Sequence, residues 1–106
     1  MRRLTRTYAF SDDEALDRIR ALSDYWHTKH SVDTAWVGSV GRLRGKKMGV
    51  SYDATVRVGD GRVDIEVDAG WLADKLGAPA YVERKLDTYL DPAESVASLR
   101  ARIPRS

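Results

Sequence analysis

The feature that most constrains the fold is a long alternating segment, residues 48–70, which reads MGVSYDATVRVGDGRVDIEVDAG. Polar and apolar residues alternate on both sides of Asp60-Gly61, a pair that favours the positive φ values of a tight hairpin turn. A two-residue turn at this pair gathers the apolar side chains on one face and sets Val56 opposite Ile65. A three-residue loop would mix the two faces. The segment therefore predicts a β-hairpin in a defined register.

An amphipathic helix is predicted before this hairpin, from residue 12 to about His30. Ser11 and Glu14 have the spacing of a capping box, in which two side chains satisfy otherwise unpaired amides at a helix start. Apolar residues then recur at helical spacing and form one stripe, which must pack on the apolar face of the hairpin. These residues are Leu16, Ile19, Leu22 and Trp26.

Two short strands are expected outside the hairpin. Residues 2–10, RRLTRTYAF, alternate and predict a first strand. Residues 34–40, TAWVGSV, predict another strand, which Gly38 and Gly41 weaken.

Two helices are expected after the hairpin, beyond a helical turn at Trp71, Leu72 and Leu76. Pro79 suits the first turn of the first helix, which has one apolar face. A second start signal, DPAE at residues 91–94, predicts a short C-terminal helix. The apolar face of the first helix holds Val82, Leu86, Tyr89 and Leu90.

These elements predict an α+β fold. We expect a two-layer antiparallel sheet with helices packed on one face, in the order β-α-β-β-β-α plus a short C-terminal helix. With 106 residues and 42% hydrophobic content, residues 1–106 have the size of a single domain with one core.

Composition excludes several classes of protein. The chain has no cysteine, which excludes disulfides, thiolate metal sites and cysteine nucleophiles and fits a cytoplasmic protein. No apolar run approaches the roughly 20 residues of a membrane span, so no transmembrane segment is expected. The 18 basic and 16 acidic side chains are too evenly balanced to predict a nucleic-acid partner.

Residues 38–49, GSVGRLRGKKMG, form a glycine-rich cationic stretch. The spacing does not fit a P-loop, because no hydroxyl residue follows the lysine and no helix is expected after it. We interpret the stretch as a flexible connection at the edge of a sheet. An alternative is a contact with an anion or a partner, with Trp36 as an exposed aromatic beside the cations. The cations are Arg42, Arg44, Lys46 and Lys47.

Two further groups of polar residues are candidates for metal or catalytic sites. One combines His27 and His30 with Asp24 and Asp33. The negative end of a helix dipole explains histidines in a last turn more simply. The other group contains the acids of the hairpin's outer face, Asp53, Glu66 and Asp68, which we expect to be solvated. We therefore expect no catalytic residue, metal or cofactor, and a protein that is not an enzyme.

The residues after the second helix form an amphipathic tail, residues 91–106. Its stripe of Val96, Leu99 and Ile103 admits two interpretations. The stripe lies on an external apolar surface, or it closes over the core of the domain. We expect the domain to fold without residues 92–106, because the sheet and the two main helices already form a complete core.

The order of these elements resembles the small bacterial family of polyhydroxyalkanoic acid system proteins. The resemblance rests on the hairpin running into Gly70-Trp71-Leu72, within VSYDATVRVGDGRVDIEVDAGWL, and on ERKLD at residues 83–87, within YVERKLDTYL. It covers about residues 3–90, an α+β core, and leaves the tail outside.

The resemblance implies an accessory protein of polyhydroxyalkanoate storage, at the granule surface or associated with the synthase. The implied partner is a granule or a granule protein in the cytoplasm, and a homodimer would strengthen attachment through avidity. The rival hypothesis is a small cytosolic module that binds an anionic ligand or nucleic acid through the glycine-rich cationic stretch.

Overall fold

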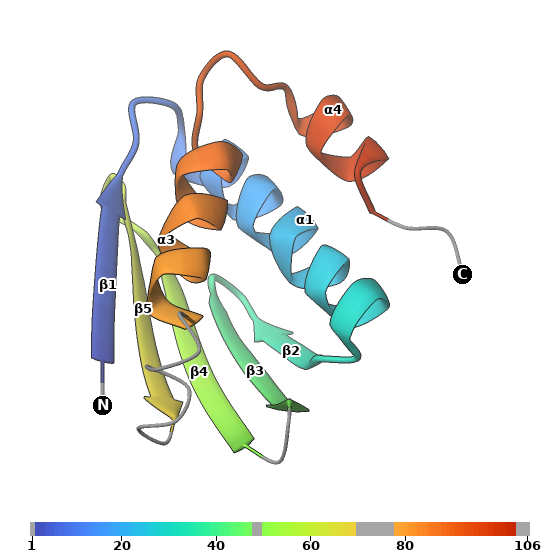
Figure 1. Cartoon of the computed structure of the whole chain (residues 1–106). Coiled ribbons are helices and arrows are strands. Elements are labelled where there is room, and N and C mark those ends of the chain that lie inside the picture. The colour runs from blue at the N-terminus through green and yellow to red at the C-terminus, as the bar shows by residue number, and fades with distance from the viewer. Residues whose placement is uncertain (1, 48–49, 70–77, 104–106) are drawn as a thin grey trace.

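A five-stranded antiparallel sheet forms one layer of the molecule, and helices cover one of its faces (Figure 1). This computed structural model describes residues 2–47, 50–69 and 78–103. The strand order is β1-β5-β4-β3-β2. The predicted α+β fold class is confirmed. In chain order the elements are β1 (Arg2–Thr7), α1 (Asp12–His30), β2 (Asp33–Val37), β3 (Val40–Lys47), β4 (Val50–Gly59), β5 (Arg62–Ala69), α3 (Ala78–Tyr89) and α4 (Val96–Ala101).

The hairpin of β4 and β5 has the predicted register. Val56 lies opposite Ile65, and both side chains are buried. Asp60 and Gly61 have φ values of 54° and 76°, so both turn residues adopt the left-handed conformation that a two-residue hairpin requires. The pairing continues to Tyr52, which lies opposite Ala69. The hairpin thus forms the middle of the sheet and one wall of the core.

The interpretation of residues 38–49 as a flexible connection at the edge of a sheet is wrong for residues 40–47, and residues 48–49 lie outside the described residues. Residues 40–47 form strand β3, which pairs with β2 on one side and β4 on the other. Its residues alternate, with Gly41 and Leu43 buried towards the helices and Arg42 and Arg44 exposed on the opposite face. The sheet therefore has one strand more than the sequence pattern predicted.

Gly41 is accommodated in β3 because the ring of Trp36 covers it. Trp36 lies opposite Gly41 in the β2–β3 pair, and a Cβ atom at this glycine would be 2.8 Å from the indole ring. The ring is held from the other side by Ser23, whose hydroxyl accepts the indole N–H at 3.1 Å. Glycine has no side chain, which lowers its strand propensity, but at Gly41 this leaves the space that the Trp36 ring occupies.

Replacing Gly41 by alanine should destabilise the domain by about 1 to 3 kcal/mol, because the new methyl group must displace a half-buried indole. Chemical denaturation followed by circular dichroism measures this change. Gly59→Ala is the matched control, since no atom lies within 4 Å of a Cβ built at Gly59 in β4. Equal stability of the two variants would contradict the close approach of Trp36 to Gly41.

Helix α1 begins and ends as predicted. Ser11 is its N-cap and accepts a hydrogen bond from the amide of Glu14. At the other end Ser31 adopts a left-handed conformation, and its amide donates to the carbonyl of His27. Ile19 and Leu22 of the predicted stripe are buried against the sheet.

The later helices agree with the sequence pattern in part. Helix α3 spans Ala78–Tyr89, and Leu86 on its predicted apolar face is buried. Helix α4 begins later than the DPAE signal predicted, at Val96 after the N-cap Ser95. Asp91 instead caps a turn, because its carboxylate accepts from the amide of Ala93. The predicted helical turn at Trp71, Leu72 and Leu76 lies outside the described residues.

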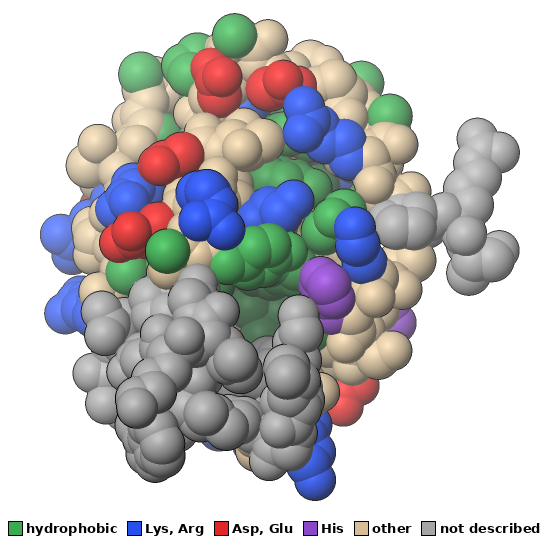
Figure 2. All heavy atoms as spheres, in the orientation of Figure 1, with side chains coloured by type: hydrophobic (Ala, Val, Ile, Leu, Met, Phe, Trp, Pro, Cys, Tyr) green, Lys and Arg blue, Asp and Glu red, His purple; other side chains and the backbone are tan. Residues whose placement is uncertain are grey.

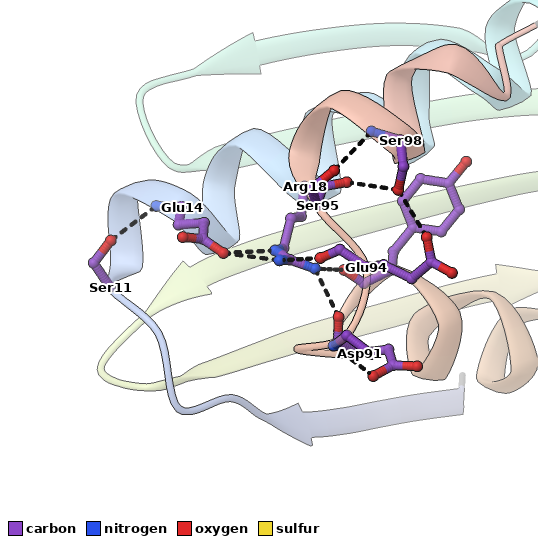
Figure 3. Close-up of polar contacts among 9 residues, drawn as sticks. Ser11, Glu14, Arg18, Asp91, Glu94, Ser95 and Ser98 are labelled. Carbon is purple, nitrogen blue, oxygen red and sulfur yellow. Dashed lines mark hydrogen bonds and ion pairs between the residues drawn. The ribbon is translucent and has the colours of Figure 1, made fainter.

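Arg18 of α1 holds the segment between α3 and α4 against the domain (Figure 3). Its guanidinium donates to the carbonyls of Tyr89, Asp91 and Glu94 at 3.1, 3.0 and 2.6 Å. It also pairs with the carboxylate of Glu14 at 2.8 Å. The side chain is only 3% exposed, so this cation is buried but fully engaged.

The core lies between the sheet and the helices. It is one cluster that draws on all three described helices and on four strands. Its buried members are Leu4, Ala15, Ile19, Ala21, Leu22, Val32, Leu43, Ala54, Val56, Val58, Val63, Ile65, Leu86, Tyr89, Leu90 and Leu99.

Candidate functional site

The predicted cationic contact residues lie on the face of the sheet opposite the helices, here called the outer face. Arg42, Arg44 and Lys46 alternate along β3 and are exposed. Arg42 and Arg44 both pair with Asp53 of β4, at 3.0 and 3.4 Å. Lys47 belongs to β3, but its side chain lies outside the described part of the chain. Two of the four cations therefore share a single carboxylate, which offsets one of their two charges.

Other charges of the outer face are paired in the same way. Asp64 accepts from the Thr5 hydroxyl at 2.8 Å and pairs with Arg62 at 3.1 Å. The hydrogen bond from Thr5 and the nearby arginines lower the pKa of the Asp64 carboxyl. Arg57 pairs with Glu66 at 3.7 Å. Alternating charges on neighbouring strands thus form ion pairs across this face.

The acids and histidines weighed as ligands do not form a site. The hydrogen bond from Arg42 is the main cause that lowers the pKa of Asp53, while Glu66 faces Arg57. His27 uses its Nδ1 to contact the carbonyl of Val32 at 2.9 Å. Within residues 2–47, 50–69 and 78–103, no group of three metal-ligating side chains is gathered.

Trp36 does not join the cations. Its ring lies on the helix side of the sheet, where the indole N–H donates to Ser23 and the Arg20 guanidinium stands 5.4 Å from the ring centre. Arg42 and Arg44 project from the other side. Trp36 is thus half-buried rather than exposed, and the predicted combination of an aromatic with these cations is not assembled.

The apolar residues of the tail do not form a surface stripe. Leu99 is completely buried and belongs to the core cluster. Val96 and Ile103 are partly buried on either side of it. Arg100 pairs with Asp24 of α1 at 3.4 Å, which holds α4 against α1 from outside. The interpretation that the tail closes over the core applies to Leu99, so this residue is not available to an external surface.

An apolar patch is exposed elsewhere, at the end of the β2–β3 hairpin. Val37 is 83% exposed and Val40, its partner in the strand pair, is 40% exposed. They are the exposed large hydrophobic residues among those that the structure describes. Both lie on the outer face, since Trp36 and Gly41 next to them face the helices. This patch is not evident from the sequence, because the pattern TAWVGSV does not show which face of the strand the helices cover.

A second group of residues lies on the helix side, between α1 and α3. We call it the α1–α3 cluster, and its members are Tyr25, Trp26, Lys29, Tyr81, Lys85 and Tyr89. Figure 2 shows an apolar hollow on this side with basic side chains and a histidine at its rim. Both histidines of the chain lie in the last turn of α1, so the hollow opens beside that end of the helix.

Aromatic rings and two lysines meet in the α1–α3 cluster. The ammonium group of Lys85 is 4.5 Å from the ring centre of Tyr25 and 5.8 Å from that of Tyr81. Lys29 approaches Tyr25 from the same helix, at 5.5 Å. Its hydrogen bond lowers the pKa of the Tyr25 phenol, and the positive charge of Lys85 acts in the same direction. The Trp26 N–H donates to the Tyr81 hydroxyl at 3.2 Å.

Tyr89 adds a buried hydroxyl to this cluster. The residue is 1% exposed, and its hydroxyl has no hydrogen-bond partner among the described residues. Burial is the main cause that raises the pKa of the Tyr89 phenol; Tyr25 and Tyr81 act in the same direction, and the positive charge of Arg102 acts against them. A buried hydroxyl without a partner is unusual, because it costs free energy comparable to a lost hydrogen bond.

A helical spacing could have revealed this cluster from the sequence. Tyr81, Lys85 and Tyr89 recur every four residues on α3, and Tyr25 and Lys29 have the same spacing on α1. Of these five residues, the sequence pattern placed only Tyr89, on the apolar face of the helix after the hairpin. Only the packing of α1 beside α3 brings the two sets together.

The comparisons with known proteins identify the family. The family described as "Putative polyhydroxyalkanoic acid system protein" matches residues 3–93, from β1 to just beyond the end of α3. The comparison with curated proteins and the comparison with solved structures each find no match. Among the described residues, no helix has the length and apolar composition of a membrane span. The matched residues cover most of the chain, which therefore belongs to the family of polyhydroxyalkanoic acid system proteins.

Proposed function

We propose that the chain is a non-enzymatic accessory protein of polyhydroxyalkanoate storage that attaches to the granule surface through the outer face of its sheet. The observation that carries this proposal is the exposure of Val37, at 83%, beside Val40 on a face that the helices leave uncovered. The family supports a role in the polyhydroxyalkanoate system. The burial of Leu99 in the core leaves the tail with little apolar surface to offer and so favours the outer face over the tail.

The outer face is chemically complementary to a polyester. Such a surface presents apolar groups and ester carbonyls, which accept hydrogen bonds but cannot donate them. Val37 and Val40 offer apolar contact, which is favourable when it removes their surface from water. The exposed guanidinium groups of Arg42, Arg44 and Arg57 offer donors. Their pairing with carboxylates keeps the face nearly neutral, so apolar contact and hydrogen bonding would dominate.

The rival function, binding of an anionic ligand or nucleic acid through β3, has less support. Arg42 and Arg44 share the carboxylate of Asp53, and Trp36 lies on the other face. An anion would have to displace this carboxylate. Salt dependence separates the two functions, because nucleic-acid affinity falls steeply with ionic strength and apolar attachment does not.

Replacing Val37 and Val40 together by threonine should reduce the affinity for granules by about thirtyfold, since two apolar contacts of about 1 kcal/mol each would be lost. Threonine keeps the β-branched shape that strands favour, so the domain should remain folded. The measurement is the fraction of protein that sediments with purified polyester granules. Ala97→Ser, an exposed change on α4, is the control.

Two results would count against the proposal. If the wild-type chain does not sediment with granules at any salt concentration, granule attachment is wrong. If the double variant is folded by circular dichroism and sediments as well as the control, the attachment surface lies outside the β2–β3 hairpin.

A further inference from the structure

We infer that the α1–α3 cluster is a binding site for a hydroxycarboxylic acid with an apolar chain, its carboxylate held by Lys29 and Lys85 and its oxygen atoms within reach of the Tyr25 and Tyr89 hydroxyls. This site lies on the helix side of the sheet, away from the outer face. It goes beyond the proposed attachment to granules and does not depend on it.

The first argument is charge. Lys29 and Lys85 both lie against the ring of Tyr25, and neither has a carboxylate partner among the described residues. Two acids of the same helices pair with arginines instead, since Asp87 of α3 pairs with Arg6 at 2.9 Å and Asp24 of α1 pairs with Arg100 at 3.4 Å. Two ammonium groups around one phenol repel each other. An anion between them would relieve this repulsion.

The second argument is the hydroxyl of Tyr89. It is buried without a hydrogen-bond partner in the described structure, near Tyr25, Tyr81 and the Arg102 guanidinium. Buried hydroxyls are almost always satisfied, so an orphan in this position indicates a missing polar atom. A ligand oxygen would supply it. The two lysines and the Tyr89 hydroxyl are thus independent indications of a ligand at the α1–α3 cluster.

The third argument concerns the apolar part of the ligand. Trp26 and Tyr81 lie with their ring centres 6.5 Å apart, and apolar side chains line the hollow that Figure 2 shows on this side. A site that combines apolar walls with a few convergent polar groups is typical of small-molecule binding. Inorganic anions would use the lysines but leave these walls empty.

The family description indicates the chemical class of the acid. A polyhydroxyalkanoic acid is built from hydroxyalkanoic acids, which carry a carboxylate, a hydroxyl and an apolar chain. The same chemistry has two sources, the free acid and the carboxyl end of a polymer chain. Both present the group that Lys29 and Lys85 would bind.

The test uses the full chain and 3-hydroxyoctanoate, with isothermal titration calorimetry as the readout. We expect saturable binding, and binding of 1,3-octanediol should be weaker by about tenfold or more because it lacks the charge that the lysines recognise. A linear ester dimer of the same acid mimics the carboxyl end of a polymer chain and so distinguishes it from the free acid. Tighter binding of the dimer supports the proposal and indicates a chain end, whereas tighter binding of the monomer supports it and indicates the free acid.

Three variants test the residues. Lys85→Gln and Lys29→Gln should each weaken binding of the acid by about tenfold, since each removes one charged donor. Binding of the diol should not change. Tyr89→Phe should weaken binding of the acid roughly fivefold. The free variant should melt at the same or a higher temperature than the wild type, because a buried hydroxyl without a partner is removed. Arg84→Gln, an exposed neighbour of Lys85 on α3, is the matched control and should bind as the wild type does.

The proposal is overturned if the wild type binds neither acid, or if the diol binds as tightly as the acid. It is also overturned if both lysine variants bind like Arg84→Gln. A purely structural role for Tyr89 predicts that Tyr89→Phe leaves acid binding unchanged. Circular dichroism of each variant separates loss of binding from loss of folding, and failure of granule sedimentation with intact acid binding would reject the proposed function alone.

Discussion

Replacing Arg18 by methionine should lower the free energy of unfolding by about 3 to 5 kcal/mol, as expected when one partner of a buried charged network is removed. The guanidinium is 3% exposed and donates to three carbonyls that close the segment from Tyr89 to Glu94. Methionine fills similar volume but also loses the guanidinium that stands 4.4 Å from the centre of the Phe10 ring. It leaves the carbonyls without a donor.

Urea denaturation followed by circular dichroism measures this effect. Arg100→Met is the matched control, because Arg100 makes a single exposed ion pair with Asp24 and should contribute less than about 1 kcal/mol. Arg18→Lys tests geometry, since an ammonium group cannot reproduce the planar fork of five donors. A loss below about 1 kcal/mol for Arg18→Met would show that the α3–α4 segment is held by other contacts.

Deleting residues 92–106 should destabilise the domain severely, contrary to the expectation from sequence that the remainder forms a complete core. The deletion removes Leu99, which is completely buried, and takes away the Glu94 carbonyl that Arg18 binds at 2.6 Å. Loss of one buried leucine side chain costs about 2 to 5 kcal/mol. Total stability of a small domain is about 5 to 15 kcal/mol, so much of it would be lost.

The measurement is the melting temperature of the truncated and full-length chains. Leu99→Ala in the full chain isolates the buried side chain and should account for about 2 to 5 kcal/mol. Val96→Ala on the same helix, which is only partly buried, is the control and should cost less. If the truncated chain has the same melting temperature as the wild type, the tail contributes nothing to the core.

The sequence by itself determined the elements whose signals are local. Asp60 and Gly61 specify the hairpin turn because few residues tolerate positive φ, and the alternation around them leaves one register that buries a single face. Ser11 specifies the start of α1 because its hydroxyl satisfies an amide three residues away. The outer-face location of the hairpin acids follows from the same alternation.

The tertiary structure alone decided the features that join residues distant in the chain. Gly41 lies in a strand because the ring of Trp36 fills the space above it, which overrides the low strand propensity of glycine. Leu99 is buried because α4 packs on α1. Lys85 meets Tyr25 only when α3 lies beside α1, since sixty residues of chain separate them. Periodicity shows which face of an element is apolar, but which partner covers that face depends on the packing of the whole chain.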